Sequence, residues 1–143
     1  MRRTFTIPLL LLLGCTQSSD VIDGNAVTAP VEPRSEEADL DRGEILSLAC
    51  QACHTLDAGQ ADLLGPNLYS MFGRVSAGSP GFGYSAVLRS ANLIWTPRAL
   101  DAWLASPEDF LPGNDMAFAG YNSATDRRDL IAFLLHKTGG VAE

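Results

Sequence analysis

The pattern of apolar and polar positions predicts three helices, over residues 40–52, 98–106 and 127–138. Thr96-Pro97 is typical of a helix start, Pro107 of a helix end, and Ser123-x-x-Asp126 of the start of the last helix, which Gly139 ends. The first helix is indicated by its apolar residues Leu40, Ile45, Leu46 and Leu48. In the second helix, Leu100, Trp103 and Leu104 are expected to face inward, and Leu130, Ile131, Phe133 and Leu134 form the apolar face of the last helix. The segment 73–84 contains four glycines and a proline, so we expect an irregular loop there.

The first residues of the chain have the layout of a bacterial export signal. Two arginines precede an apolar stretch from Ile7 to Leu13, which is too short to span a membrane. Leu12-Leu13-Gly14-Cys15 then resembles a lipobox, where a lipoprotein precursor is cut before the cysteine and the cysteine is acylated. We therefore expect a lipoprotein signal peptide over 1–14 and lipidation of Cys15. The alternative is a plain secretory peptide followed by an unrelated cysteine.

Residues 16–39 have six acidic residues against one arginine, and neither helical nor strand periodicity. We expect a flexible acidic tether over 15–39, followed by one domain over 40–143; the alternative is an ordered extension packed on that domain. The whole chain of 143 residues has 10 basic and 17 acidic side chains, a net charge of −7. This balance argues against nucleic-acid binding, which depends on clustered basic residues.

Cys50-Gln51-Ala52-Cys53-His54 carries the most specific chemistry in the chain, because Cys-x-x-Cys-His is the attachment pattern of c-type haem. Two thiols at this spacing can each add to one vinyl group of a single haem, and the adjoining imidazole then reaches one axial face of the iron. The alternatives are a thioredoxin-like dithiol, half of a zinc site, or a structural disulfide. They fit less well because no βαβ context and no second cysteine pair are present, and a disulfide leaves His54 without a role.

Further motifs follow in order. Pro66 of Gly65-Pro66-Asn67-Leu68 lies 12 positions after His54, and Met116 lies 62 positions after it. Further matches are Phe72-Gly73-Arg74, Tyr84, Trp95, Pro112-Gly113-Asn114-Asp115-Met116, Phe118 and 128–134. With these motifs, nearly all of residues 39–137 resemble a class I monohaem c-type cytochrome of the mitochondrial type. The resemblance implies an all-α cytochrome c fold: three main helices, short helices and long loops wrapped around one covalently bound haem c.

The resemblance also implies roles for individual residues. Cys50 and Cys53 would bind the haem covalently, with His54 and Met116 as axial ligands of the iron and the Pro66 carbonyl accepting a hydrogen bond from His54. The expected hydrogen-bond donors to the haem propionates are Arg74, Tyr84, Trp95 and Asn114, and Phe118 is expected at the exposed haem edge. Trp103 occupies the position near the methionine sulfur where the family usually has a tyrosine. That departure removes a hydroxyl from the pocket.

Three further expectations concern residues outside this set. Met71 fits a core position, and His136 is expected at the surface. In the family the first and last helices cross closely, which implies contacts of Gly43 and Leu46 with Leu130 and Phe133.

The function that this pattern predicts is single-electron transfer by a membrane-tethered carrier, not an enzyme, on the periplasmic side of the inner or outer membrane. The expected partners are redox proteins: a quinol:cytochrome c oxidoreductase, a terminal oxidase or reductase, or a photosynthetic reaction centre. No small-molecule substrate is expected. Because basic residues are sparse and Asp115 adjoins Met116, we expect a partner with a basic or largely apolar docking face. The alternatives are a fixed haem subunit of a larger complex, or a haem enzyme of peroxidase, nitrite or NO chemistry with a displaceable sixth ligand.

Overall fold

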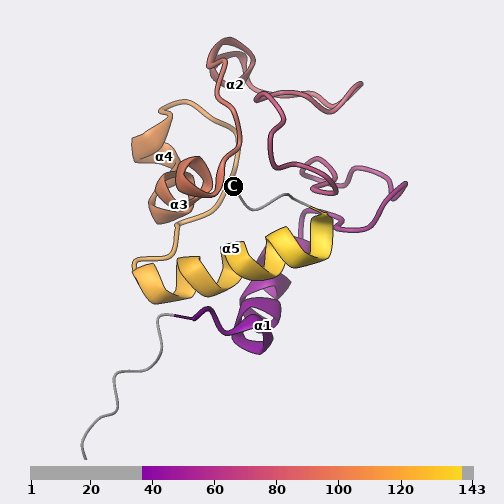
Figure 1. The fold of residues 1–143 in the computed structure, drawn as a ribbon. Helices are drawn as coiled ribbons and strands as arrows, with labels where there is room; N and C mark the ends of the chain where they lie inside the picture. The colour runs from indigo at the N-terminus through magenta and orange to yellow at the C-terminus, as the bar shows by residue number, and fades with distance from the viewer. Residues whose placement is uncertain (1–36, 140–143) are drawn as a thin grey trace, which may run out of the picture. The chain divides into compact units, whose positions relative to one another are not determined.

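The computed structural model describes residues 37–139. These residues contain five helices: α1 (Leu40–Gln51), α2 (Ala86–Ser90), α3 (Pro97–Ala105), α4 (Pro107–Phe110) and α5 (Ala124–Thr138) (Figure 1). Between residues 37 and 139 there is no strand, only an isolated antiparallel bridge between Val75 and Ile94. None of the helices in this range has the length and apolar character needed to cross a membrane. The predicted signal peptide, Cys15 and most of the predicted tether lie outside the described residues.

The three predicted main helices are present, with boundaries that follow from their capping residues. The hydroxyl of Ser123 accepts a hydrogen bond from the backbone N–H of Asp126, so α5 begins at Ala124 rather than at residue 127. Thr96 caps α3 in the same way, by accepting from the N–H of Ala99. Gly139 ends α5 with a φ of +78°, a left-handed conformation that glycine adopts without strain.

Two short helices differ from the prediction. Pro107 does not simply end a helix: α3 stops at Ala105, and the side chain of Ser106 then caps a new helix, α4, in which Pro107 takes the first position. Helix α2 was not predicted. It has only five residues and follows the glycine-rich loop, so it carries too little periodicity to be recognised. The loop 73–84 is irregular, as expected.

Helices α1 and α5 cross at a point where Gly43 faces α5 (Figure 1). A β-carbon at Gly43 would overlap the carbonyl oxygen of Asp129 and lie 2.7 Å from Cβ of Phe133. Only a glycine therefore permits this approach, and the predicted contact of Gly43 with Phe133 is confirmed. The hydroxyl of Tyr121 also donates to the backbone carbonyl of Leu46 over 2.9 Å, which ties the chain before α5 to α1.

The predicted apolar faces of α3 and α5 form the core. Their seven residues are all buried: Leu100, Trp103, Leu104, Leu130, Ile131, Phe133 and Leu134. On α1, by contrast, the apolar residues Leu40, Ile45 and Leu48 are exposed; Ile45 keeps 68% of its surface accessible and Leu48 keeps 63%. The physical reason is the close crossing, which α1 makes with its small residues Gly43 and Ser47.

A buried carboxylate joins the start of α1 to α5. The side chain of Asp129 is 1% exposed and accepts hydrogen bonds from Nη2 of Arg128 (2.7 Å) and from the backbone N–H of Asp39 (3.2 Å). Nη1 of Arg42 lies 3.8 Å from its other oxygen. Burial acts to raise the pKa of Asp129, but these hydrogen bonds and the charges of Arg128 and Arg42 outweigh it and hold the pKa below its ordinary value.

Candidate functional site

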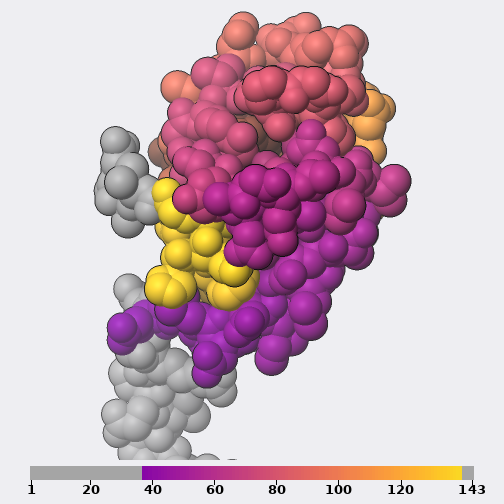
Figure 2. Space-filling view, turned by 90° about the vertical axis from the view of Figure 1, so that its right-hand side faces the viewer, coloured from indigo at the N-terminus to yellow at the C-terminus, as the bar shows by residue number. Residues whose placement is uncertain are grey.

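A cavity of about 460 Å³ is enclosed by the end of α1, the loops that follow it, α3 and the loop after α4. This volume lies within the range of roughly 300–1,000 Å³ that is typical of ligand and cofactor pockets. The space-filling view shows a hollow between the magenta and the orange-pink segments (Figure 2). The walls are mainly apolar, with side chains that include Leu68, Met71, Phe82, Leu88, Trp95, Leu100, Leu104 and Phe118.

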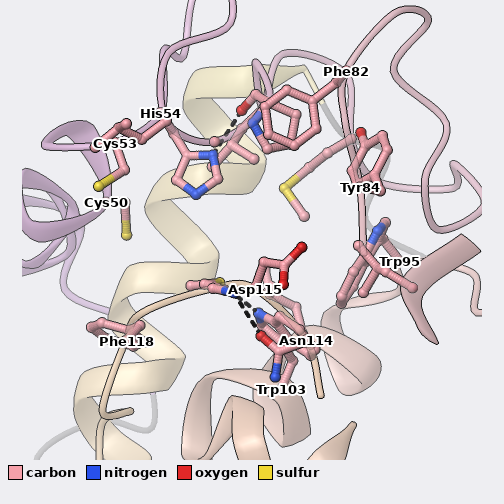
Figure 3. A pocket seen from close by; sticks show the side chains of 18 of the residues that line it. Cys50, Cys53, His54, Phe82, Tyr84, Trp95, Trp103, Asn114, Asp115 and Phe118 are labelled. Atoms are coloured by element: carbon pink, nitrogen blue, oxygen red, sulfur yellow. Dashed lines mark hydrogen bonds between the residues drawn. The ribbon is translucent and has the colours of Figure 1, made fainter. Parts of the chain in front are cut away.

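Cys50, Cys53 and His54 lie together at one side of this cavity (Figure 3). Cys50 belongs to the last turn of α1, and its carbonyl accepts hydrogen bonds from the backbone N–H groups of Cys53 (3.0 Å) and His54 (2.9 Å). This tight turn directs all three side chains into one cavity. The two cysteines are not joined by a disulfide.

The environment of Cys50 keeps its thiol protonated. Burial, together with the nearby Cys53, raises the pKa of Cys50 to about 11. The thiolate is the form that exchanges disulfides and binds metal ions. A raised pKa therefore disfavours thioredoxin-like dithiol chemistry, in which the attacking cysteine has a lowered pKa.

The imidazole of His54 has a fixed orientation. Its Nδ1 atom donates to the carbonyl oxygen of Pro66 over 2.7 Å, the contact that the family resemblance implies. With the proton on Nδ1, the Nε2 atom is the free acceptor and a suitable metal ligand. Burial lowers the pKa of His54, against the opposing effects of the Pro66 carbonyl and the charge of Asp62, and so favours the neutral ring that metal coordination requires.

Gly65 packs directly against this ring, a role that its place in the Gly65-Pro66-Asn67-Leu68 motif did not predict. A β-carbon at Gly65 would lie 2.6 Å from Nδ1 and 2.7 Å from Nε2 of His54. The backbone N–H of Gly65 donates to the carbonyl of Cys53 over 2.8 Å, which holds the loop in place. The glycine is therefore needed for close approach to the imidazole rather than for an unusual backbone angle.

Met116 lines the same cavity and comes from the loop after α4. The Nε1 atom of Trp103 donates to the Met116 sulfur over 3.2 Å. The Oδ1 atom of Asn114 accepts from the backbone N–H of Met116 over 2.9 Å. The indole N–H of Trp103 thus donates a hydrogen bond to this sulfur, at the position where the family usually has a tyrosine hydroxyl.

The four predicted propionate donors, Arg74, Tyr84, Trp95 and Asn114, all line the cavity. Arg74 donates to the carbonyl of Asn67 over 3.2 Å, and the hydroxyl of Tyr84 accepts from the N–H of Ser79 over 3.1 Å. The side-chain amide of Asn114 donates to the carbonyls of Pro107 and Leu111, each over 3.0 Å. Both hydrogens of this amide are thus engaged with backbone carbonyls at the two ends of α4, and a bond from it to a propionate would have to replace one of these contacts.

The structure also gives the positions of three further residues named from the sequence. Phe118 lines the cavity and contacts Tyr121 edge to face, with ring centroids 5.2 Å apart. Met71 is buried in the core and also lines the cavity, and His136 is exposed. Phe82 was missed; it packs edge to face on Tyr84 at 4.8 Å, but it lies in the glycine-rich loop where no periodicity reveals a wall residue.

The donor set fits a covalently attached haem. Two thiols, an oriented imidazole and a thioether share one cavity with predominantly apolar walls, and polar groups are few. Soft sulfur and neutral imidazole are donors that suit haem iron. Mainly apolar walls also limit the access of water to a bound cofactor.

No protein-family model matches the chain. Individual proteins do: cytochrome c of Chlamydomonas reinhardtii is 42% identical over 101 residues, which cover 70% of this chain and 90% of that protein. Cytochrome c2 of Agrobacterium tumefaciens is 36% identical over 102 residues, covering 69% of this chain and 92% of that protein. A cytochrome c homolog of Bradyrhizobium diazoefficiens is 36% identical over 110 residues, covering 76% of this chain but 60% of that longer protein. The chain therefore belongs to the cytochrome c family, whose members are electron carriers rather than enzymes and carry one covalently bound haem c.

Proposed function

We propose that this chain is a membrane-tethered single-electron carrier whose haem c is attached through Cys50 and Cys53 and has His54 and Met116 as axial ligands. The observation that carries the proposal is the shared cavity: it brings an imidazole with a fixed tautomer and a hydrogen-bonded thioether to the same apolar space. The haem supplies an iron that takes up and releases one electron. A neutral thioether favours the reduced iron, so this pair of ligands corresponds to a raised reduction potential.

The residues around the ligands act by limiting movement. Pro66 and Gly65 hold the ring of His54 from two sides, and Asn114 holds the backbone of Met116. If both ligands keep their positions in the two oxidation states, little of the protein has to rearrange when the electron moves. The apolar walls exclude water, which would otherwise reorganise around the changing charge.

The same contacts argue against the alternative of a substrate-binding haem enzyme. Such an enzyme needs a sixth ligand that leaves the iron readily. The sulfur of Met116 is held by Trp103, and its backbone is held by Asn114. No observation specifically favours displacement of this ligand.

Carbon monoxide separates the two functions, because it binds ferrous haem only where a coordination position is open. We expect the matured, reduced wild-type protein to show no change in its optical spectrum under carbon monoxide over minutes. Met116→Ala should bind it promptly and serves as the positive control. Rapid binding by the wild-type protein would contradict the carrier function and favour the enzyme.

The membrane tether is proposed from the sequence, since residues 1–36 are not described. A signal peptide over 1–14 and acylation of Cys15 would anchor the domain on the periplasmic side, and a flexible segment of 24 residues spans roughly 25–30 Å. The wild-type precursor should incorporate labelled fatty acid in a bacterial host, and Cys15→Ser should not. Haem-loaded wild-type protein released without label would contradict the anchor.

The proposed partners are redox proteins of the respiratory or photosynthetic chain: quinol:cytochrome c oxidoreductase, a terminal oxidase or reductase, or a photosynthetic reaction centre. The charges support a partner with a basic docking face. Within residues 37–139, four of the seven arginine and lysine side chains form ion pairs, Arg42 with Asp126, Arg127 with Asp101, Arg128 with Asp129 and Lys137 with Asp57, whereas Arg74, Arg89 and Arg98 form none. In the same range, several carboxylates form no ion pair: Asp41, Glu44, Asp62, Glu108, Asp109 and Asp115.

Asp115 lies at the cavity itself and is exposed. It therefore contributes negative charge close to where an electron would leave. Complementary charge on a partner would speed encounter and fix its orientation.

A further inference from the structure

Within residues 37–139, the indole N–H of Trp103 is the one hydrogen-bond donor to the sulfur of Met116, the proposed iron ligand. We infer that Trp103 is a positioning residue that donates its N–H to the Met116 sulfur, and that this hydrogen bond raises the reduction potential of the haem. The inference rests on the proposed ligation of the iron by Met116.

The donor is held in place from several sides. Trp103 is 5% exposed, on the face of α3 that also buries Leu100 and Leu104. Its ring packs edge to face on Trp95, with centroids 5.4 Å apart, and on Phe110 at 6.0 Å. A large ring confined in this way cannot turn its N–H elsewhere without disturbing the core, and in a buried position water does not compete for the donor.

The acceptor is held independently of the indole. The bond from the Met116 N–H to Oδ1 of Asn114 is 2.9 Å long, and the amide of Asn114 is anchored on the Pro107 and Leu111 carbonyls. Two separately fixed elements, α3 and the loop after α4, thus present donor and acceptor at 3.2 Å. The contact is a property of the fold rather than of one flexible side chain.

The electronic consequence follows from the chemistry of the two groups. A thioether sulfur has two lone pairs, so one can coordinate iron while the other accepts a hydrogen bond. Donation of an N–H to the sulfur withdraws electron density from it and weakens its support of ferric iron more than of ferrous iron. Hydrogen bonds to metal ligands tune potentials in this way.

An indole also differs from a hydroxyl in a way that matters here. The indole N–H can only donate, whereas a tyrosine hydroxyl can also accept and can rotate its hydrogen toward another partner. Trp103 therefore offers the sulfur a donor in both oxidation states. A fixed donor of this kind should set the potential without adding a group that titrates near neutral pH.

The test is a double-mutant cycle on the haem-loaded protein. Trp103→Phe keeps an aromatic ring and removes the N–H; we expect its reduction equilibrium against a one-electron reference couple to fall by about three- to tenfold, the upper figure being about 59 mV. In the Met116→His background no sulfur is present, so the same substitution should change the equilibrium by less than about twofold. An equal effect in both backgrounds would mean that Trp103 acts through packing alone and would overturn the inference.

Two control variants sharpen the result. Phe110→Leu alters the packing of the same indole but leaves its N–H, and should change the equilibrium by less than about twofold. Trp103→Tyr supplies a hydroxyl donor on a ring and should recover part of the loss seen with phenylalanine. A Trp103→Tyr protein as low in potential as Trp103→Phe would contradict the role of the donor.

A measurement on the wild-type protein needs no substitution. In the reduced, diamagnetic state, the indole N–H proton of Trp103 should show a nuclear Overhauser contact with the side chain of Met116. Its absence would overturn the inference while leaving the proposed ligation intact. A wild-type protein that lacks the sulfur–iron charge-transfer band would instead overturn the ligation, and the inference with it.

Discussion

The backbone of Gly65 lies so close to the ring of His54 that a β-carbon would come within 2.6 Å of Nδ1. The same ring atom donates to the carbonyl of Pro66 over 2.7 Å. A single loop therefore positions the imidazole both by contact and by hydrogen bond, and it allows no alternative ring position on that side.

Gly65→Ala should displace the imidazole of His54. Because the added methyl group overlaps the ring, either the loop or the ring has to move, and the bond to Pro66 should lengthen. We expect a mixture of spin states in the optical and paramagnetic resonance spectra of the oxidised protein. Gly59→Asn is the matched control, since Gly59 lies on an exposed turn with a φ of +76° and no atom within 4 Å of its added β-carbon. A fully low-spin Gly65→Ala protein would contradict this assignment.

Gly43→Ala should loosen the crossing of α1 and α5. The new methyl group would lie 2.7 Å from Cβ of Phe133 and would overlap the carbonyl of Asp129, so the helices must separate. Overpacking of this kind costs about 1–3 kcal/mol of unfolding free energy. Denaturant unfolding of the haem-loaded protein measures the loss. Glu44→Ala, on an exposed neighbouring position, should change stability by less than about 0.5 kcal/mol; equal effects of the two substitutions would refute the close crossing.

Asp129 should make the stability of the fold sensitive to acid. Its pKa in the folded protein is below the ordinary value, so its ionised form stabilises the fold above about pH 4, and this contribution is lost as the pH falls through the folded-state pKa. Asp129→Asn should cost about 1–3 kcal/mol at pH 7, because it weakens hydrogen bonds to a buried charge. The difference between the two proteins should shrink as the pH falls below about 4. Stability curves that stay parallel over this range would contradict the prediction.

Asp115 should assist encounter with a basic partner. Because it is exposed at the cavity, Asp115→Lys should slow electron transfer to a redox protein with a lysine-rich face, by about two- to tenfold at low ionic strength. Stopped-flow kinetics measure the rate. The difference should vanish near 1 M salt, where the screening length is about 3 Å. Wild-type rates that rise, or stay flat, as salt is added would count against the basic partner.

The haem-attachment motif could be predicted because its residues are contiguous, so their proximity needs no knowledge of the fold. His54 and Met116 are 62 positions apart, so their presence in one site could be predicted only from the resemblance to a family. The buried faces of α3 and α5 were also predictable, because the apolar residues on each helix, such as Leu104 and Leu130, recur at helical spacing and are buried in the core.

The face of α1 could not be predicted by the same reasoning. Hydrophobicity alone would place Ile45 and Leu48 against α5, but the small residues Gly43 and Ser47 are the ones buried there. Their burial follows from the close approach of two helices that are far apart in the sequence. The donor on the Met116 sulfur was missed for a similar reason. The identity of Trp103 indicates that a hydroxyl is absent, but the direction of its N–H is set by the packing of three aromatic rings.

The axial sulfur is the point on which the proposed carrier most depends. The near-infrared absorption of the oxidised, matured protein measures it directly, because a weak charge-transfer band in that region arises from a sulfur–iron bond. We predict that the wild-type protein shows this band at neutral pH, that reduction abolishes it, and that Met116→Ala lacks it while keeping haem bound through Cys50 and Cys53. A wild-type protein without the band, or a band that survives in Met116→Ala, would contradict the proposed ligation.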